Sequence, residues 1–235
     1  MRRLITCLLF VTLPLCVQAA EKTEKLLFIG NSFTFFNGGI EHHASQLARY
    51  ARQSANPLAF RNAFGGETLQ GHIQRRNTPD IINMQPWNHV IIQGYSNEPL
   101  TDYKRFENAA KTLSEMAANQ GAQSHLLITW AYRNRPVMIE KLQDAYLKAA
   151  RHLGNDAIPA GPAFALALER RPSLNLYSDN KHPNLAGTYL AACVVYQWLF
   201  DKPATQSQYT AGLPAELATF LQTVAQDTVI AFRDK

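Results

Sequence analysis

Short apolar runs alternate with amphipathic helical stretches along most of the chain, and this alternation constrains the fold more than any other feature. Five runs have the character of strands, at residues 25–29, 58–63, 89–92, 124–130 and 156–160. Helical periodicity fills the intervals, at about 40–53, 69–76, 103–119, 136–153, 185–200 and 214–232. Strands that alternate with helices of this length form a parallel sheet with helices on both faces. The pattern predicts an α/β fold, a three-layer α/β/α sandwich with a mainly parallel five-stranded sheet.

The N-terminus differs from the rest of the chain. Two arginines precede an apolar run over residues 4–17, and small residues follow at the positions that signal peptidase reads. The run is too short for a stable membrane span. A lipoprotein signal at Cys16 is the weaker interpretation, because Leu15 stands where that signal requires a small residue. We predict a signal peptide over 1–19, one domain over 20–235, and export to the periplasm or outside the cell.

Removal of the leader would leave one cysteine, Cys193, and lower the formal net charge from +5 to +3, since two arginines leave with no acid. A single cysteine forms no intramolecular disulfide, so the core alone must stabilise the exported chain, and a chain of 235 residues permits this. A small, dispersed positive charge does not indicate nucleic-acid binding. The sequence predicts neither a nucleic-acid partner nor a stable membrane span, and it leaves the oligomeric state open.

A candidate nucleophile, Ser32, follows the first predicted strand in the segment Gly30-Asn31-Ser32-Phe33-Thr34. Ligands of parallel α/β sheets bind at the carboxyl ends of the strands. Backbone N–H groups at the start of a following helix can stabilise a developing oxyanion. Taken alone, these residues are explained more simply as a Gly/Asn/Ser turn with Ser32 as a helix N-cap.

A second candidate segment, Ser178 to Asn184, contains Asp179 and His182 close to the C-terminus. A serine hydroxyl needs an imidazole to take its proton, and the imidazole needs an acid to fix its tautomer. An aspartate three residues before a histidine can reach Nδ1 within one loop and leave Nε2 for the serine. The alternative is a turn in which Asp179 or Asn184 caps a helix.

The two segments together resemble the SGNH (GDSL-like) hydrolases, which carry Gly-Asp-Ser or Gly-Asn-Ser after the first strand and Asp-x-x-His near the C-terminus. The resemblance implies a flavodoxin-like SGNH fold, Ser32 as nucleophile, His182 as base and Asp179 as its acid, with no metal and no organic cofactor. It also implies that the backbone N–H of Ser32 and of a glycine after the second strand bind the oxyanion. Gly66 matches that glycine, and a flexible turn is the alternative.

The segment after the third strand departs from the usual Gly-x-Asn-Asp motif of these hydrolases and reads Gln93-Gly94-Tyr95-Ser96-Asn97. It resembles the Gln-Gly-x-Ser-Asn pattern of carbohydrate acetylesterases in the same superfamily. The resemblance implies that Gln93 or Asn97 supplies an amide to the oxyanion, and Gln93 is favoured because it directly ends the strand. Together with the predicted export, this resemblance predicts a serine esterase that acts through an acyl-enzyme. The expected reaction removes a small acyl group, with acetyl as the first choice, from a carbohydrate.

Two other functions use the same residues: a non-catalytic envelope or carbohydrate-binding protein on this scaffold, and an acyltransferase. The expected partner is a small-molecule or carbohydrate ester. Adjacent His42 and His43 are interpreted as a solvated surface, because neighbouring helical residues point apart and do not chelate one metal. His72 is interpreted as a helix-face residue, and Cys193 as a buried, inert thiol.

Overall fold

The computed structural model describes residues 23–51, 55–75 and 77–233. The predicted signal peptide, with its cleavage site, lies outside the described residues, so that prediction stays a prediction.

The strands form one sheet whose members all run parallel, in the order β2-β1-β3-β4-β5. The strands are β1 (Lys25–Gly30), β2 (Leu58–Ala63), β3 (His89–Ile92), β4 (Gln123–Leu127) and β5 (Asp156–Ile158). This confirms the predicted α/β sandwich with a parallel five-stranded sheet. Because the strands are parallel and in register, the carboxyl ends of β1, β2 and β3 meet at one edge of the sheet.

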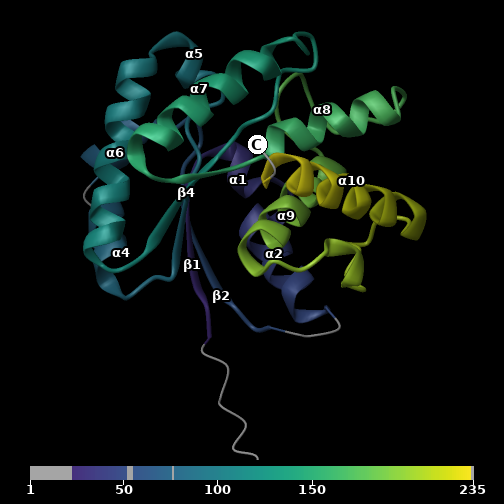
Figure 1. Cartoon of the computed structure of the whole chain (residues 1–235), viewed down its shortest axis with the longest axis horizontal. Coiled ribbons are helices and arrows are strands. Elements are labelled where there is room, and N and C mark those ends of the chain that lie inside the picture. The colour runs from purple at the N-terminus through teal and green to yellow at the C-terminus, as the bar shows by residue number, and fades with distance from the viewer. Residues whose placement is uncertain (1–22, 52–54, 76, 234–235) are drawn as a thin grey trace, which may run out of the picture.

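Helices cover both faces of the sheet, as Figure 1 shows. One face carries α2 (Ile40–Arg49), α8 (Ala160–Arg170), α9 (Leu185–Phe200) and α10 (Ala215–Arg233). The opposite face carries α3 (Leu69–Gln74), α4 (Asn77–Met84), α6 (Tyr103–Asn119) and α7 (Met138–Leu153). The short helices α1 (Ser32–Phe35) and α5 (Glu98–Thr101) follow β1 and β3, and 3-10 turns lie at Phe36–Gly38 and Ala204–Gln206.

Strand β1 divides the hydrophobic residues between two cores. Leu26 and Phe28 belong to the core under α9, whereas Leu27 and Ile29 belong to the core under α6. All four side chains are at most 1% exposed, because successive residues of a strand point to opposite faces and both faces are covered. The apolar character of residues 26–29 therefore follows from the position of β1 inside the sheet, between β2 and β3 and under helices on both faces.

Some predicted boundaries and omissions need correction. β4 ends at Leu127 and β5 at Ile158, each earlier than predicted, and α8 begins two residues after β5. Helix α8 was not predicted, although Ala160, Phe164 and Ala167 share one buried face of it. Pro162 obscured this helix, yet a proline in the first turn costs no internal hydrogen bond. The short helices α4 and α5 were also not predicted.

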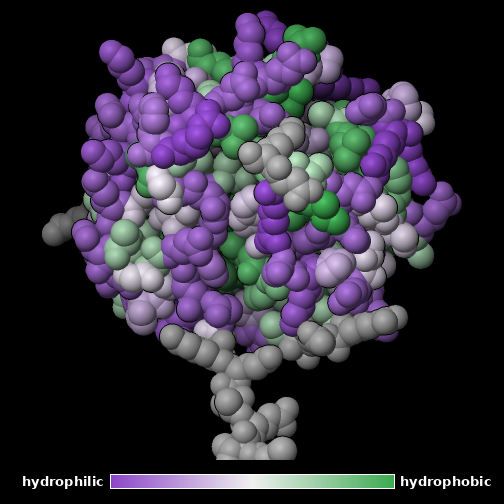
Figure 2. All heavy atoms as spheres, viewed as in Figure 1, coloured by the Kyte–Doolittle hydropathy of each residue, from purple (hydrophilic) through white to green (hydrophobic). Residues whose placement is uncertain are grey.

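The outer surface is mainly hydrophilic on the face seen in Figure 2, with smaller groups of hydrophobic side chains among the charged ones. Within the described residues, no helix has both the length and the apolar character that crossing a bilayer requires. Cys193 is fully buried in α9, and this burial raises the pKa of its thiol.

Candidate active site

The turn between β1 and α1 holds Ser32 at the carboxyl edge of the sheet. Asn31 is the N-cap of α1, since its Oδ1 accepts a hydrogen bond from the Phe33 N–H at 3.1 Å. Ser32 is therefore the first residue of the helix and not its cap, and its hydroxyl is free for another partner. Gly30 is required just before, because a Cβ there would lie 2.3 Å from Thr34 Oγ1 and 2.6 Å from Gln93 Oε1.

The loop that carries Asp179 and His182 is closed by its own backbone. The Ser178 N–H donates to the His182 carbonyl at 2.9 Å, and Tyr177 forms an antiparallel bridge with Pro183. Asn184, just after the loop, caps α9 by accepting from the Gly187 N–H. The cap predicted as an alternative is thus present, and it fixes the end of the loop while Asp179 faces the histidine.

Ser32, His182 and Asp179 form a continuous hydrogen-bonded row. Ser32 Oγ lies 3.0 Å from His182 Nε2, and His182 Nδ1 lies 2.6 Å from Asp179 Oδ2. The second carboxylate oxygen accepts the N–H groups of Lys181 and His182, both at 2.7 Å. These contacts fix the carboxylate and leave Nε2 of the ring to face the serine, as proton removal from the hydroxyl requires.

The carboxylate of Asp179 stays ionised over a wide pH range. Burial opposes ionisation, but hydrogen bonds from the His182 ring and from the two backbone N–H groups outweigh it and lower the pKa of Asp179 to about 2. The side chain of Asp179 is 54% exposed and that of His182 only 20% exposed. The imidazole is therefore mostly buried, whereas the carboxylate that contacts it is exposed to solvent.

Aromatic rings hold the imidazole from the sides. Phe36 stacks on His182 with ring centroids 4.5 Å apart, and Phe33 meets the same ring edge-on at 5.9 Å. Phe33 in turn stacks on Trp130 at 4.6 Å, and Trp130 on Phe164 at 4.4 Å. Because Phe33 and Phe36 follow Ser32 in the sequence, the segment that carries Ser32 also orients the imidazole of His182.

No protein-family model matches the sequence, and no curated protein matches it significantly. Solved structures do match. A DUF4886 family protein from Bacteroides uniformis aligns with a TM-score of 0.73 at 20% identity, over 91% of this chain and 97% of that one. A protein from Slackia heliotrinireducens assigned to the SGNH hydrolases aligns at 0.64 and 26% identity, over 75% and 98%. The chain has an SGNH (GDSL-like) hydrolase fold.

An acetylxylan esterase from Geobacillus stearothermophilus shares this fold, with a TM-score of 0.60 at 18% identity, over 74% of this chain and 93% of that one. At this identity the likeness concerns the fold alone.

Within the SGNH fold, the turn after β2 lies against the turn that carries Ser32. The Phe64 N–H donates to the Gly30 carbonyl at 3.2 Å, and Asn31 Nδ2 donates to the Glu67 carbonyl at 3.0 Å. Gly66 has a φ of +70°, which favours glycine, and a Cβ there would meet no atom within 4 Å. Across the described residues, no backbone group accepts the N–H of Ser32 or of Gly66. Both therefore remain candidate oxyanion donors.

Both ends of the Gln93 amide form hydrogen bonds within the protein. Its Oε1 accepts from the Asn31 N–H at 3.0 Å and from Thr34 Oγ1 at 2.9 Å, and its Nε2 donates to the Gly94 carbonyl. Gln93 is 1% exposed. These contacts favour a positioning role, in which Gln93 ties the end of β3 to the turn that carries Ser32. Its predicted role as oxyanion donor stays a prediction.

Asn97, the other candidate amide, is the N-cap residue of α5, and its carbonyl accepts the N–H groups of Leu100 and Thr101. Its side chain lines a cavity of about 430 Å³ that it shares with Tyr132 and Arg135. The structure thus places Asn97 toward the loop after β4, and its oxyanion role also stays a prediction.

Two buried histidines make contacts that were not predicted from the sequence. His72 is fully buried, and its Nε2 lies 2.8 Å from the Gly30 carbonyl at the end of β1. His43, predicted on a solvated surface, is 5% exposed and lies 2.7 Å from the Tyr209 hydroxyl and 2.8 Å from the Asn37 carbonyl. That prediction was wrong for His43, whose spacing from Ile40 and Leu47 places it on the buried face of α2.

Asn37 also contributes to the site, and no motif in the sequence indicated this. Its Nδ2 donates to the Pro183 carbonyl at 2.9 Å and to Thr188 Oγ1 at 2.8 Å. It thereby joins the segment after Ser32 to the segment after His182. Across the described residues, no group of three or more His, Cys, Asp or Glu side chains is arranged to hold a metal ion.

Proposed function

We propose that the chain is an exported serine esterase that hydrolyses a small acyl ester, with an acetyl ester on a carbohydrate as the first substrate class. The observation that carries the proposal is the 3.0 Å contact between Ser32 Oγ and His182 Nε2, with Asp179 at 2.6 Å from Nδ1. A serine aligned with a base whose other nitrogen is held by a carboxylate is the arrangement that activates a hydroxyl. The SGNH fold, shared with named hydrolases, supports it.

In the first half of the reaction, Ser32 Oγ attacks the ester carbonyl while His182 Nε2 takes its proton. The N–H groups of Ser32 and Gly66 stabilise the oxyanion, a contribution of about 3–4 kcal/mol for one such donor. Asp179 stabilises the imidazolium. When the tetrahedral intermediate collapses, the imidazolium gives its proton to the departing alcohol and the acyl group stays on Ser32.

In the second half, water enters and His182 removes one of its protons as the oxygen attacks the acyl-enzyme. Collapse of the second tetrahedral intermediate releases the carboxylic acid and returns the proton to Ser32 Oγ. The cycle uses an ester and one water molecule and yields an alcohol and an acid. An acyltransferase would use the same residues with a sugar hydroxyl in place of water.

The carbohydrate part of the proposal has two supports. The segment from Gln93 to Asn97 resembles that of carbohydrate acetylesterases, and a neighbour in fold acts on acetylxylan according to its name. Export rests on the predicted signal peptide over 1–19, which places the protein in the periplasm or outside the cell, where such polymers occur.

The test is acetate release from p-nitrophenyl acetate and from acetylated xylan by the purified protein, beside Ser32→Ala. We expect release by the wild type and none above background by the variant. Chromatography of the sugar products separates transfer to a hydroxyl from transfer to water. A well-folded protein that releases no acid and transfers no acyl group from any of a broad ester panel would contradict the proposal and favour a binding protein.

A further inference from the structure

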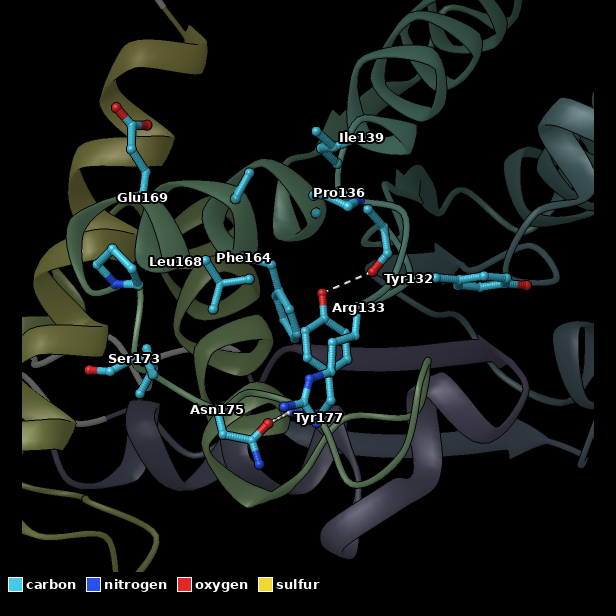
Figure 3. Close-up of a pocket in the computed structure, with 15 residues that line it drawn as sticks. Tyr132, Arg133, Pro136, Ile139, Phe164, Leu168, Glu169, Ser173, Asn175 and Tyr177 are labelled. Atoms are coloured by element: carbon cyan, nitrogen blue, oxygen red, sulfur yellow. Dashed lines mark hydrogen bonds between the residues drawn. The ribbon is translucent and has the colours of Figure 1, made fainter.

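A cavity of about 640 Å³ lies beside the loop that carries Asp179 and His182 (Figure 3). Its walls are the loop between β4 and α7, one side of α8, and the segment that leads from α8 to Tyr177. Its volume falls within the 300–1,000 Å³ range of small-molecule sites. Ser32, Asp179 and His182 do not line it, so it is a separate compartment from the space in front of the nucleophile.

The cavity and the candidate triad share a wall. The Tyr177 hydroxyl donates to the Ala131 carbonyl at 2.9 Å, and the Arg133 N–H donates to the Asn180 carbonyl at 2.8 Å. Asn180 lies between Asp179 and His182 in sequence. One side of this wall thus faces the cavity, and the loop bonded to it carries Asp179 and His182, so the cavity adjoins the candidate site.

One wall of the cavity is apolar and its rim is polar. Phe164 and Leu168 of α8 form the apolar wall, and Arg133 and Asn175 lie toward the other side (Figure 3). Asn175 Oδ1 accepts the Tyr177 N–H at 3.0 Å, which orients its amide and leaves the Nδ2 hydrogens as donors.

The guanidinium of Arg133 is also available to a ligand. Within the described part of the chain it has no ion pair, whereas Arg170 and Arg171 on the same side of the molecule pair with Asp227 at 2.6 Å and with Glu216 at 3.3 Å. The cavity therefore offers two sets of free hydrogen-bond donors opposite an apolar wall.

We propose that this cavity binds a saccharide unit of the polymer whose ester reacts at Ser32, with the sugar ring against Phe164 and Leu168 and its oxygens bonded to Arg133 and Asn175. The inference rests on the proposed function and names the subsite that would give it substrate specificity. A sugar ring combines apolar C–H faces with oxygen-bearing edges, which matches the two kinds of wall. A long acyl chain would desolvate Arg133 and Asn175 without giving them partners, which costs free energy.

The experiment compares four proteins: the wild type, Arg133→Ala, Ala165→Trp and Arg135→Ala. Arg133→Ala removes the donor, and Ala165→Trp fills the cavity from α8. Arg135→Ala is the matched control, because Arg135 lies in the same loop but lines the other cavity. Each protein is assayed with p-nitrophenyl acetate, p-nitrophenyl octanoate, and acetylated tetrasaccharides of xylan, glucomannan, chitin and galacturonan.

For at least one tetrasaccharide we expect Arg133→Ala and Ala165→Trp to lower kcat/KM about tenfold or more relative to kcat/KM for p-nitrophenyl acetate, mainly through KM. A tenfold loss corresponds to one hydrogen bond from a charged donor. Arg135→Ala should keep the wild-type ratio. Unchanged ratios in both cavity variants would overturn the inference. It would also be overturned if the wild type preferred the octanoate and only Ala165→Trp removed that preference.

Binding separates this inference from the proposed function. Calorimetry with the Ser32→Ala protein measures tetrasaccharide affinity without turnover, and Arg133→Ala in that background should weaken it about tenfold. If no ester is hydrolysed by the wild type, the proposed function fails while this titration still tests the cavity. If esters are hydrolysed and no tetrasaccharide binds, the cavity inference alone fails.

Discussion

Two clusters of histidine and carboxylate lie at opposite ends of the strands of the same sheet. At the carboxyl ends of the strands, His182 bridges Asp179 and Ser32. At the other edge, His89 Nδ1 lies 2.9 Å from His125 Nε2, and His125 Nδ1 lies 3.3 Å from Asp156 Oδ2.

The clusters share residue types but differ in their partners. His125 is 2% exposed, and both of its ring nitrogens face other protein groups. In the first cluster the nitrogen away from the carboxylate meets a hydroxyl, and free backbone N–H groups lie beside it. The comparison teaches that a histidine beside a carboxylate becomes a candidate catalytic base only where the topology places a hydroxyl at its other nitrogen, as the carboxyl end of β1 places Ser32.

The largest expected effect follows from the loss of the Ser32 hydroxyl, the proposed nucleophile. Ser32→Ala should lower kcat by roughly 10⁴-fold or more, because the remaining residues cannot form an acyl-enzyme, with the free energy of unfolding nearly unchanged. The control at the opposite edge is Ser124→Ala, which removes a buried hydroxyl without a hydrogen-bond partner. It should keep wild-type kcat. Steady-state hydrolysis of p-nitrophenyl acetate and urea unfolding measure both; equal activity losses in the two variants would contradict the comparison.

The two aspartates should differ almost as strongly. Asp179→Asn should lower kcat about 10³–10⁴-fold, because an amide cannot hold the same tautomer or stabilise the imidazolium. Asp156→Asn, at the other edge, should change kcat less than about twofold, in the range of a substitution remote from the site. The same ester assay decides, and a small effect of Asp179→Asn would remove this residue from the site.

The histidines should show opposite effects on stability and activity. His125→Ala should lower the free energy of unfolding by about 2–4 kcal/mol, since it leaves a buried cavity and an unpartnered His89 nitrogen. His182→Ala should abolish hydrolysis and change stability by less than about 1 kcal/mol. Urea unfolding at pH 7.5, with the ester assay on the folded fraction, measures both. If the folded fraction of His125→Ala were also inactive, the distinction between the two histidines would be wrong.

The free energy of unfolding should depend on pH through His89, in the second cluster. Burial and the nearby His125 lower the pKa of His89 from 6.5 to about 4. The unfolded chain therefore binds more protons there, and the contribution of neutral His89 is full above pH 6.5 and is lost as pH falls toward 4. His89→Gln should flatten this part of the profile, an effect of at most about 3 kcal/mol. Asp179, with its pKa near 2, stays ionised throughout this window; an unchanged slope in His89→Gln would refute the assignment.

The smallest effect tests the glycine beside the nucleophile. Gly66 and Gly121 both have positive φ, +70° and +76°, with open space where a Cβ would lie. Alanine at either position should cost about 1 kcal/mol of stability from backbone strain. Only Gly66→Ala should also lower kcat, about tenfold, by displacing an oxyanion N–H. Equal kcat in the two variants would exclude Gly66 from the oxyanion site.

The sequence was sufficient for the sheet and for the three residues brought together at its edge. Those predictions rest on strong local signals: apolar runs for the strands, and short blocks at strand ends for Ser32, Asp179 and His182. Pro162 obscured α8, and nothing local distinguished Gln93 as a donor from Gln93 as an acceptor. The distinction depends on Thr34 and Asn31, which lie 59 and 62 positions away in sequence. The roles of His43 and Asn37 likewise depend on the C-terminal segments packed against them.

The most direct measurement is labelling of the purified protein with a fluorophosphonate probe, followed by peptide mapping. An activated serine at the carboxyl edge of the sheet predicts one labelled site, Ser32, with the label lost in Ser32→Ala and in His182→Ala and retained in His125→Ala. A well-folded wild type that takes up no label, or that is labelled equally in His182→Ala, would contradict the proposed catalytic site.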